Sequence, residues 1–309
     1  MNCGRRAVLA ALLLTGCGLD PTISQPSLPA PEPDPSPSQS AEAAEATAAV
    51  AGLVFAIEAG RSAQDAPASF PAWADAAVAA LGAVLDRLRA ADPVAGGEPV
   101  FELPPPSPAT PAAAGLAESL AGASTAAEDS LRRAALAAEA QPLRLLYASA
   151  ACASRGLATV GAAPVEGGAE PRHFQGTTVA ASLPIALSHS WALIYGLGVG
   201  IGRLDRDDPL RGLGTARLAT AKELRNELRD ALPGAAPVQP ATFDLPTAMT
   251  TSDEIRAGWG ALELGLLEGL GRLVAAGGPG RERWLELMLG AVDSVGGMGW
   301  PLPHWPGWV

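Results

Sequence analysis

The sequence contains few of the residues on which several common functional classes depend. Its 309 residues include three cysteines, too few for a scaffold held together by disulfides. Aromatic residues make up only 5% of the chain and charged residues 17%, and Lys222 is its single lysine. Acidic residues outnumber basic residues by 32 to 21, which gives a formal net charge of −11. Because this charge would repel a phosphate backbone, we expect no nucleic-acid partner.

The N-terminus has the pattern of a bacterial export signal. Arg5 and Arg6 precede the apolar run 7–14, which is too short to cross a bilayer as a helix, since that takes roughly 20 residues. The run ends in the tetrapeptide Leu14-Thr15-Gly16-Cys17. This tetrapeptide resembles the lipobox, in which the cysteine is acylated and becomes the new N-terminus. We therefore predict a signal peptide over 1–16 and a lipidated Cys17, with an ordinary signal peptide cleaved nearby as the alternative.

Two export routes fit this signal. The pair Arg5-Arg6 followed by apolar residues resembles a twin-arginine motif, although any basic signal peptide for Sec export can contain such a pair. By either route, the mature protein is expected on the extracytoplasmic face of the cell membrane, held there by acyl chains such as palmitate. Residues 17–40 are polar and rich in proline, so we predict a disordered tether between the lipid anchor and the rest of the chain.

Beyond residue 40 the apolar residues recur three and four positions apart, as they do in amphipathic helices. No segment shows the sustained alternation of a strand, and the 35 glycines lack the period of three that marks collagen. The sequence therefore predicts an all-α fold. Eight helices are expected, over about 41–62, 72–91, 111–140, 142–160, 177–204, 208–231, 251–276 and 280–295.

The two halves of this helical region share one order of elements, in which two helix pairs are joined by a long loop. This order is typical of ferritin-like proteins. We therefore expect an N-terminal helical bundle over 41–163, a ferritin-like four-helix bundle over 177–300, and a tail rich in tryptophan and proline over 301–309. A single irregular helical bundle is the alternative.

Three segments of the C-terminal half resemble a known family. They are Ala186-Leu187-Ser188-His189-Ser190-Trp191-Ala192-Leu193-Ile194-Tyr195-Gly196, Phe243-Asp244-Leu245-Pro246 and Ala261-Leu262-Glu263-Leu264-Gly265. Over about 177–300 the chain is similar to a ferritin-like family of unknown function found in actinobacterial secreted lipoproteins (DUF4439). The resemblance implies a ferritin-like bundle whose first helix carries a Glu-His pair. Here Ser188 stands at the glutamate position and His189 is kept.

A metal site has little support in the residues themselves. A di-iron bundle takes four carboxylates and two histidines, including Glu-x-x-His pairs on two helices. No expected helix carries that spacing, because His173 falls in a loop and His304 in the tail. His189 and Glu263 are the weak candidates, and a satisfied buried pair is the alternative for them. We expect no cofactor and no catalytic residue, with iron or manganese only as the alternative.

Two further features have structural interpretations. Cys152 lies in an apolar, alanine-rich helix and is predicted to be a small buried residue rather than a nucleophile. Several glycines lie on one long apolar helix, at positions 196, 200 and 202, and are predicted to let another helix approach closely. Gly265 and Gly269 have the same four-residue spacing and are the expected partners.

The C-terminal tail is unusual because three of the seven tryptophans, Trp300, Trp305 and Trp308, lie in its last ten residues. One interpretation is a non-helical tail packed over the bundle. The other is an exposed aromatic patch for a partner, a glycan or the membrane interface.

Together these features predict a membrane-anchored envelope lipoprotein that is not an enzyme and serves in interaction or scaffolding. One alternative is a metal-binding ferritin-like protein or oxidoreductase, and another is a carrier that holds an apolar envelope ligand in a gap between the bundles. The expected partners are the membrane, through the lipid anchor, and an envelope protein or ligand whose identity the sequence does not give. A homodimer is left open.

Overall fold

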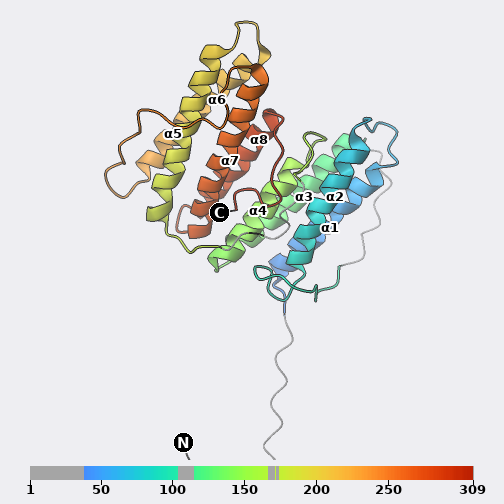
Figure 1. The fold of residues 1–309 in the computed structure, drawn as a ribbon. Coiled ribbons are helices and arrows are strands. Elements are labelled where there is room, and N and C mark those ends of the chain that lie inside the picture. Colours follow the sequence, from blue (N-terminus) through green and yellow to red (C-terminus); the bar gives the residue numbers. More distant parts are fainter. Residues whose placement is uncertain (1–37, 104–114, 166–170, 172–173, 309) are drawn as a thin grey trace, which may run out of the picture. The chain divides into compact units, whose positions relative to one another are not determined.

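The computed structural model describes residues 38–103, 115–165, 171 and 174–308, and this part of the chain is all-α, as predicted (Figure 1). Its eight helices are α1 (Ala41–Gly60), α2 (Phe70–Leu88), α3 (Leu116–Ala137), α4 (Gln141–Gly156), α5 (Val179–Arg203), α6 (Pro209–Asp230), α7 (Ser252–Ala276) and α8 (Arg281–Gly297). The described residues form no strand beyond an isolated bridge between Ala90 and Pro99. The predicted signal peptide, with Arg5 and Arg6, and the predicted lipidation site Cys17 lie outside the described residues.

Helices α1, α5, α6 and α7 begin at residues whose side chains cap them. Thr251 accepts a hydrogen bond from the backbone N–H of Glu254 at 3.2 Å, and the Glu254 carboxylate accepts one from the backbone N–H of Thr250 at 2.8 Å. This reciprocal arrangement satisfies backbone donors that a helix start leaves unpaired. The expected start of a helix at about residue 251 is therefore confirmed. Ser40 and Thr178 cap α1 and α5 in the same way, with their hydroxyl oxygens as acceptors.

The helices pack as two groups of four. In the first group α3 lies between α1 and α4, and α2 packs on α1 (Figure 1). In the second group α5 packs on α6 and α7, and α8 packs on α7. This arrangement is compatible with the four-helix bundle expected for the C-terminal half.

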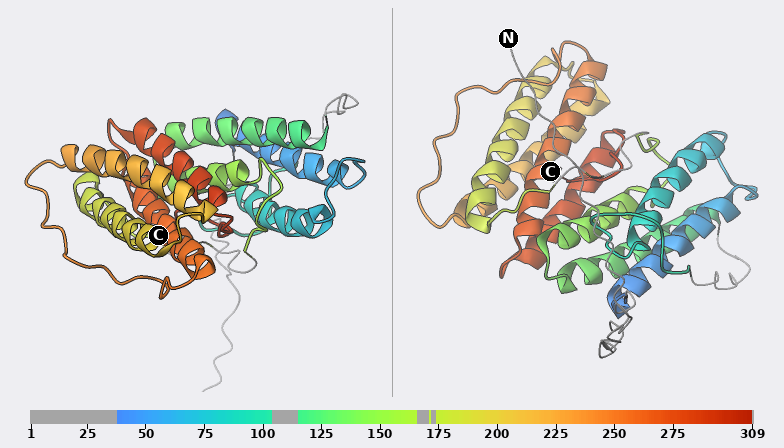
Figure 2. Two further views of the ribbon diagram at one scale, coloured as in Figure 1. Left: turned by 90° about the horizontal axis from the view of Figure 1, so that it is seen from above. Right: turned by 60° about the horizontal axis from the view of Figure 1, so that its bottom comes forward.

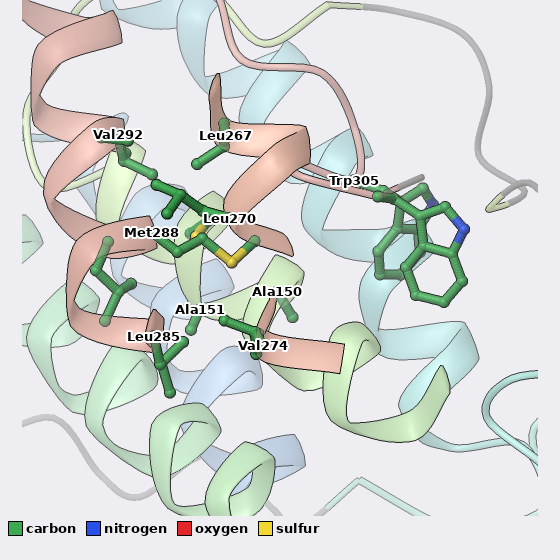
Figure 3. Close-up of a cluster of buried hydrophobic side chains, with 14 of the residues drawn as sticks. Ala150, Ala151, Leu267, Leu270, Val274, Leu285, Met288, Val292 and Trp305 are labelled. Atoms are coloured by element: carbon green, nitrogen blue, oxygen red, sulfur yellow. The ribbon is translucent and has the colours of Figure 1, made fainter. Parts of the chain in front are cut away.

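One hydrophobic core continues through both groups, because α4 packs on α7 and α8. Ala150 and Ala151 of α4 lie close to apolar side chains of those two helices, including Val274 and Met288 (Figure 3). The small side chains on α4 allow the larger ones to fill the space between the groups. The described residues from 38 to 308 accordingly belong to one compact unit.

Helices α5 and α7 run antiparallel and pack closely by inserting large side chains against glycines. Leu262 and Trp259 of α7 lie against Gly196 and Gly200 of α5, respectively. In return, His189 of α5 lies against Gly265. The prediction that Gly196 and Gly200 would face Gly265 and Gly269 was therefore wrong. Each glycine instead receives a side chain from the other helix, and a Cβ at Gly202 would meet nothing within 4 Å.

Trp259 is the largest fully buried side chain of the described residues. Its ring lies against Gly200 of α5 and Gly214 of α6, and its indole N–H donates to the carbonyl oxygen of Gly196 at 3.0 Å. Glycine is required at these positions by close approach, since a Cβ at Gly200 would lie 2.7 Å from the indole nitrogen. One side chain therefore joins α5, α6 and α7.

Arg144 joins the two groups of helices through backbone carbonyl groups. Its guanidinium is buried and donates to the carbonyl oxygens of Ala138 and Glu139 at the end of α3, and to that of Ala275 near the end of α7. The last carbonyls of a helix have no intrahelical partner and carry partial negative charge, so a cation is favourable there. Burial, and next the neighbouring Arg281, lower the pKa of Arg144.

Two helices, α1 and α5, are long and apolar enough to cross a membrane by length and composition, a test that core helices of soluble proteins also meet. The connection 231–251 between α6 and α7 lies along α5 (Figure 2). Its Phe243 ring packs on Tyr195, and its Met249 side chain lies close to Gly196.

Candidate ligand-binding cavity

A cavity of about 420 Å³ lies where α4 meets α8. Its walls come from α2, from the end of α4 and the segment that follows it, from α8, and from the C-terminal tail. Small-molecule sites in proteins measure roughly 300–1,000 Å³ and are mostly apolar, so the cavity has the size and character of such a site.

Small residues on three helices leave this space open. Ala80 of α2 and Ala153 of α4 contribute only methyl groups, and α8 contributes Gly296 and Gly297. A Cβ added to either glycine would meet nothing within 4 Å. Val292 lies one turn before Gly296, so these residues share the face of α8 that borders the cavity.

The C-terminal tail closes one side of the cavity. Leu302 packs against Gly156 at the end of α4, and its carbonyl oxygen accepts a hydrogen bond from the backbone N–H of Val165 at 3.1 Å. Trp305 and Trp308 are buried, with exposed fractions of 6% and 5%, and their rings pack on each other. These two rings fix the tail on the helices, so Trp300, Leu302 and His304 are held as wall residues.

The placement of the tail decides between the two interpretations of its tryptophans. Trp305 and Trp308 belong to the hydrophobic core, so they do not form an exposed aromatic patch. The structure instead agrees with the interpretation of a non-helical tail that packs over the helices. Trp300 is half-buried and lies against Gly260 of α7 as well as bordering the cavity.

The charged groups at the cavity are engaged with one another. Arg155 donates to both oxygens of Asp293, from Nε at 2.8 Å and from Nη2 at 2.9 Å, and to Glu128 from Nη1 at 2.7 Å. Its bond to Asp293 raises the pKa of Arg155, while burial raises the pKa of the Glu128 carboxyl against the opposing effect of Arg155. Each guanidinium nitrogen of Arg155 therefore donates to a carboxylate oxygen, and these ion pairs join α3, α4 and α8.

His304 is the wall residue with an unsatisfied polar atom. Its Nδ1 is buried and has no hydrogen-bond partner among the described residues. Its other ring nitrogen, Nε2, is not buried in this way and is the one left accessible.

The two metal candidates, Glu263 and His189, have different neighbours. Glu263 is fully buried and accepts two hydrogen bonds from Arg217 of α6, from Nε at 2.6 Å and from Nη2 at 2.9 Å. Burial raises the pKa of Glu263, and the Arg217 guanidinium opposes that effect. His189 packs on α7 instead, and burial, then Arg272, lower its pKa.

No group of three or more His, Cys, Asp or Glu residues that could hold a metal ion occurs among the described residues. The chain does contain one Glu-x-x-His spacing, Glu170 and His173, between the expected helices. Both residues lie outside the part that the structure describes.

Cys152 is fully buried in α4, as predicted. Burial raises the pKa of its thiol, so the thiolate form that attacks substrates is disfavoured.

Sequence reasoning did not find the cavity. The signal for it was local, in the pair Gly296-Gly297 near the end of a helix and in the alanines of α2 and α4, but these residues are common throughout the chain. Comparisons with family models, curated proteins and solved structures found no match to this chain.

Proposed function

We propose that this chain is a membrane-anchored envelope lipoprotein whose helical body binds a small apolar molecule without catalysing a reaction. The cavity between α4, α8 and the tail is the observation that carries this proposal. Its volume and its small apolar wall residues favour the carrier among the functions expected from the sequence.

The anchor is the other part of the proposal. The lipobox residues up to Cys17 and the proline-rich stretch 17–40 support an acylated N-terminus joined to the helical body by a tether. The apolar helix α1 near the N-terminus is compatible with a membrane location. In this arrangement the cavity lies in a body that stays close to a source of apolar molecules.

The wall of α8 provides a direct test. Gly296→Leu places an isobutyl group on the face of α8 that borders the cavity, where the space for a Cβ is open. Gly290→Leu is the matched control, because Gly290 lies on the same helix, also has open space for a Cβ, and does not border this cavity.

The measurement is mass spectrometry of organic-soluble molecules extracted from the full chain after purification from its export host. We expect one apolar molecule per chain in the unaltered protein and in Gly290→Leu, and its loss in Gly296→Leu. Absence of any such molecule from the unaltered protein, or equal amounts in both variants, would refute the carrier function.

A further inference from the structure

We infer that the cavity selects a neutral apolar molecule carrying a hydrogen-bond acceptor, such as an ester or ketone carbonyl, which pairs with the Nε2–H of His304. This inference rests on the proposed function, because it names the class of ligand for the same cavity. Three observations carry it: the state of the His304 ring, the pairing of Arg155, and the apolar character of the remaining wall.

The surroundings of His304 determine which ring nitrogen carries the proton. In a neutral imidazole one nitrogen is a donor and the other an acceptor. The buried Nδ1 has no partner among the described residues. A proton on Nδ1 would be a buried donor without a partner, whereas a proton on Nε2 places the single N–H of the ring at the accessible nitrogen, so the proton is favoured on Nε2. The accessible nitrogen of this wall residue is then a donor, and a ligand must supply the acceptor.

The charges at the cavity disfavour an anion. Arg155 is the one arginine or lysine among the described wall residues, and each of its three guanidinium nitrogens already donates to a carboxylate. Asp293 adds a carboxylate to the same wall. A carboxylate or phosphate on the ligand would therefore meet a negative group without gaining a free cation.

The remaining wall favours an apolar body. Leu81, Val292 and Leu302 border the cavity together with alanines, glycines and prolines. Such surfaces bind through removal of apolar area from water and give little directional selectivity. The wall also carries the hydroxyl of Thr159 and the indole N–H of Trp300, and among these donors the Nε2–H of His304 would set the orientation of the ligand.

Three brominated probes of matched chain length separate these features. They are methyl ω-bromoundecanoate, which has a neutral acceptor, ω-bromoundecanoate, which is an anion, and bromoundecane, which has no polar head. Bromine quenches indole fluorescence on contact, and Trp300 in the cavity wall is the reporter. Titrations use the full chain at a fixed concentration of non-ionic detergent, with Trp300→Phe to subtract the other six tryptophans.

We expect the ester to bind about threefold to tenfold more tightly than bromoundecane, the range that one net hydrogen bond gives. The carboxylate should bind no more tightly than bromoundecane. In His304→Phe the ester should lose its advantage while the affinity for bromoundecane stays the same. His304→Gln keeps an N–H donor and should retain part of the preference, which provides a second variant if the phenylalanine is not accommodated.

Equal binding of ester and bromoundecane to the unaltered chain would overturn this inference, as would tightest binding of the carboxylate. Full retention of the ester preference in His304→Phe would also overturn it. The failure of the proposed function looks different, because then Gly296→Leu would not reduce the quenching of Trp300 by any of the three probes.

Discussion

Arg217 binds the carboxylate of Glu263 through two hydrogen bonds, at 2.6 and 2.9 Å, inside the second group of helices. The exposed fraction is 0% for the Glu263 side chain and 13% for that of Arg217, so both charges have lost most of their hydration. Removing one member of such a pair leaves a buried charge without compensation, whereas replacing both can be nearly neutral.

Arg217→Met should therefore lower the free energy of unfolding by about 3–5 kcal/mol, while Arg217→Met combined with Glu263→Gln should recover much of that loss. Arg283→Met is the control, because Arg283 binds Glu227 with similar geometry but is exposed, and such pairs are worth about 0–1 kcal/mol. Denaturant unfolding of the four proteins measures these differences. Equal losses in Arg217→Met and Arg283→Met would contradict the expectation.

The same single variant should make stability depend on pH. Burial raises the pKa of Glu263, and loss of Arg217 removes the group that opposes this effect. A carboxyl whose pKa is higher in the folded state binds more protons there, so stability falls as the pH rises through the window between the unfolded and folded pKa values. Arg217→Met should accordingly lose stability as the pH rises from the unfolded glutamate pKa of about 4.3 toward neutral pH, and the double variant should not. Unfolding curves across this range test the sign.

Trp259 gives a second prediction, because its ring occupies the space that a Cβ at Gly214 would need. Gly214→Ala should destabilise the protein by about 1–3 kcal/mol through overpacking. Gly212→Ala, two residues earlier in α6, meets nothing within 4 Å and should stabilise it by about 0.5–1 kcal/mol, since alanine is the better helix former. Thermal unfolding measures both changes, and a shift of the same sign in the two variants would exclude this packing.

The contrast between these glycines shows what the sequence could predict. The eight helices follow from periodicity, which depends on residues close together in the chain, and α7 begins next to Thr251, where a helix start was expected. The four-residue spacing of glycines indicates a face for close approach but not the register of two helices some 60 residues apart. Gly200 therefore faces Trp259 rather than another glycine. The cavity and the partner of Glu263 likewise depend on contacts between residues far apart in the chain.

Arg144 gives a third prediction. Its guanidinium binds the carbonyl groups of Ala138, Glu139 and Ala275 at once, and the buried acceptors of Ala138 and Ala275 would be left unsatisfied without it. Arg144→Met should cost at least about 2 kcal/mol, since leaving a buried polar group unpaired costs about 1–3 kcal/mol. Arg144→Lys should recover only part of this loss, because one ammonium does not reproduce the planar fork of donors. Hydrogen exchange at the ends of α3 and α7 should increase in both variants, and unchanged protection at α7 would argue against the link.

The metal content of the protein is a fourth prediction. Both oxygens of Glu263 accept from Arg217, and His189 packs against Gly265 and Gly269. A metal ion would have to displace Arg217 from a buried carboxylate, so we expect no stoichiometric iron or manganese in the full chain purified without chelators. Elemental analysis measures this directly. One or two ions per chain would revive the metal-binding alternative, and loss of the metal in His189→Ala would then locate the site.

The lipid anchor gives the last prediction. Cys17 completes the lipobox, whereas Cys152 is buried in α4 and is sealed from modifying enzymes by the core. In export-competent cells fed labelled palmitate, the unaltered chain and Cys152→Ala should incorporate the label, and Cys17→Ser should not. Each buried methylene contributes about 0.8 kcal/mol to membrane binding, so a doubly acylated chain should stay in the membrane fraction at high salt. The Cys17→Ser variant lacks the acyl chains and should be released from that fraction. Label in Cys17→Ser, or none in the unaltered chain, would reject lipidation at Cys17 and with it the membrane-anchored half of the proposed function.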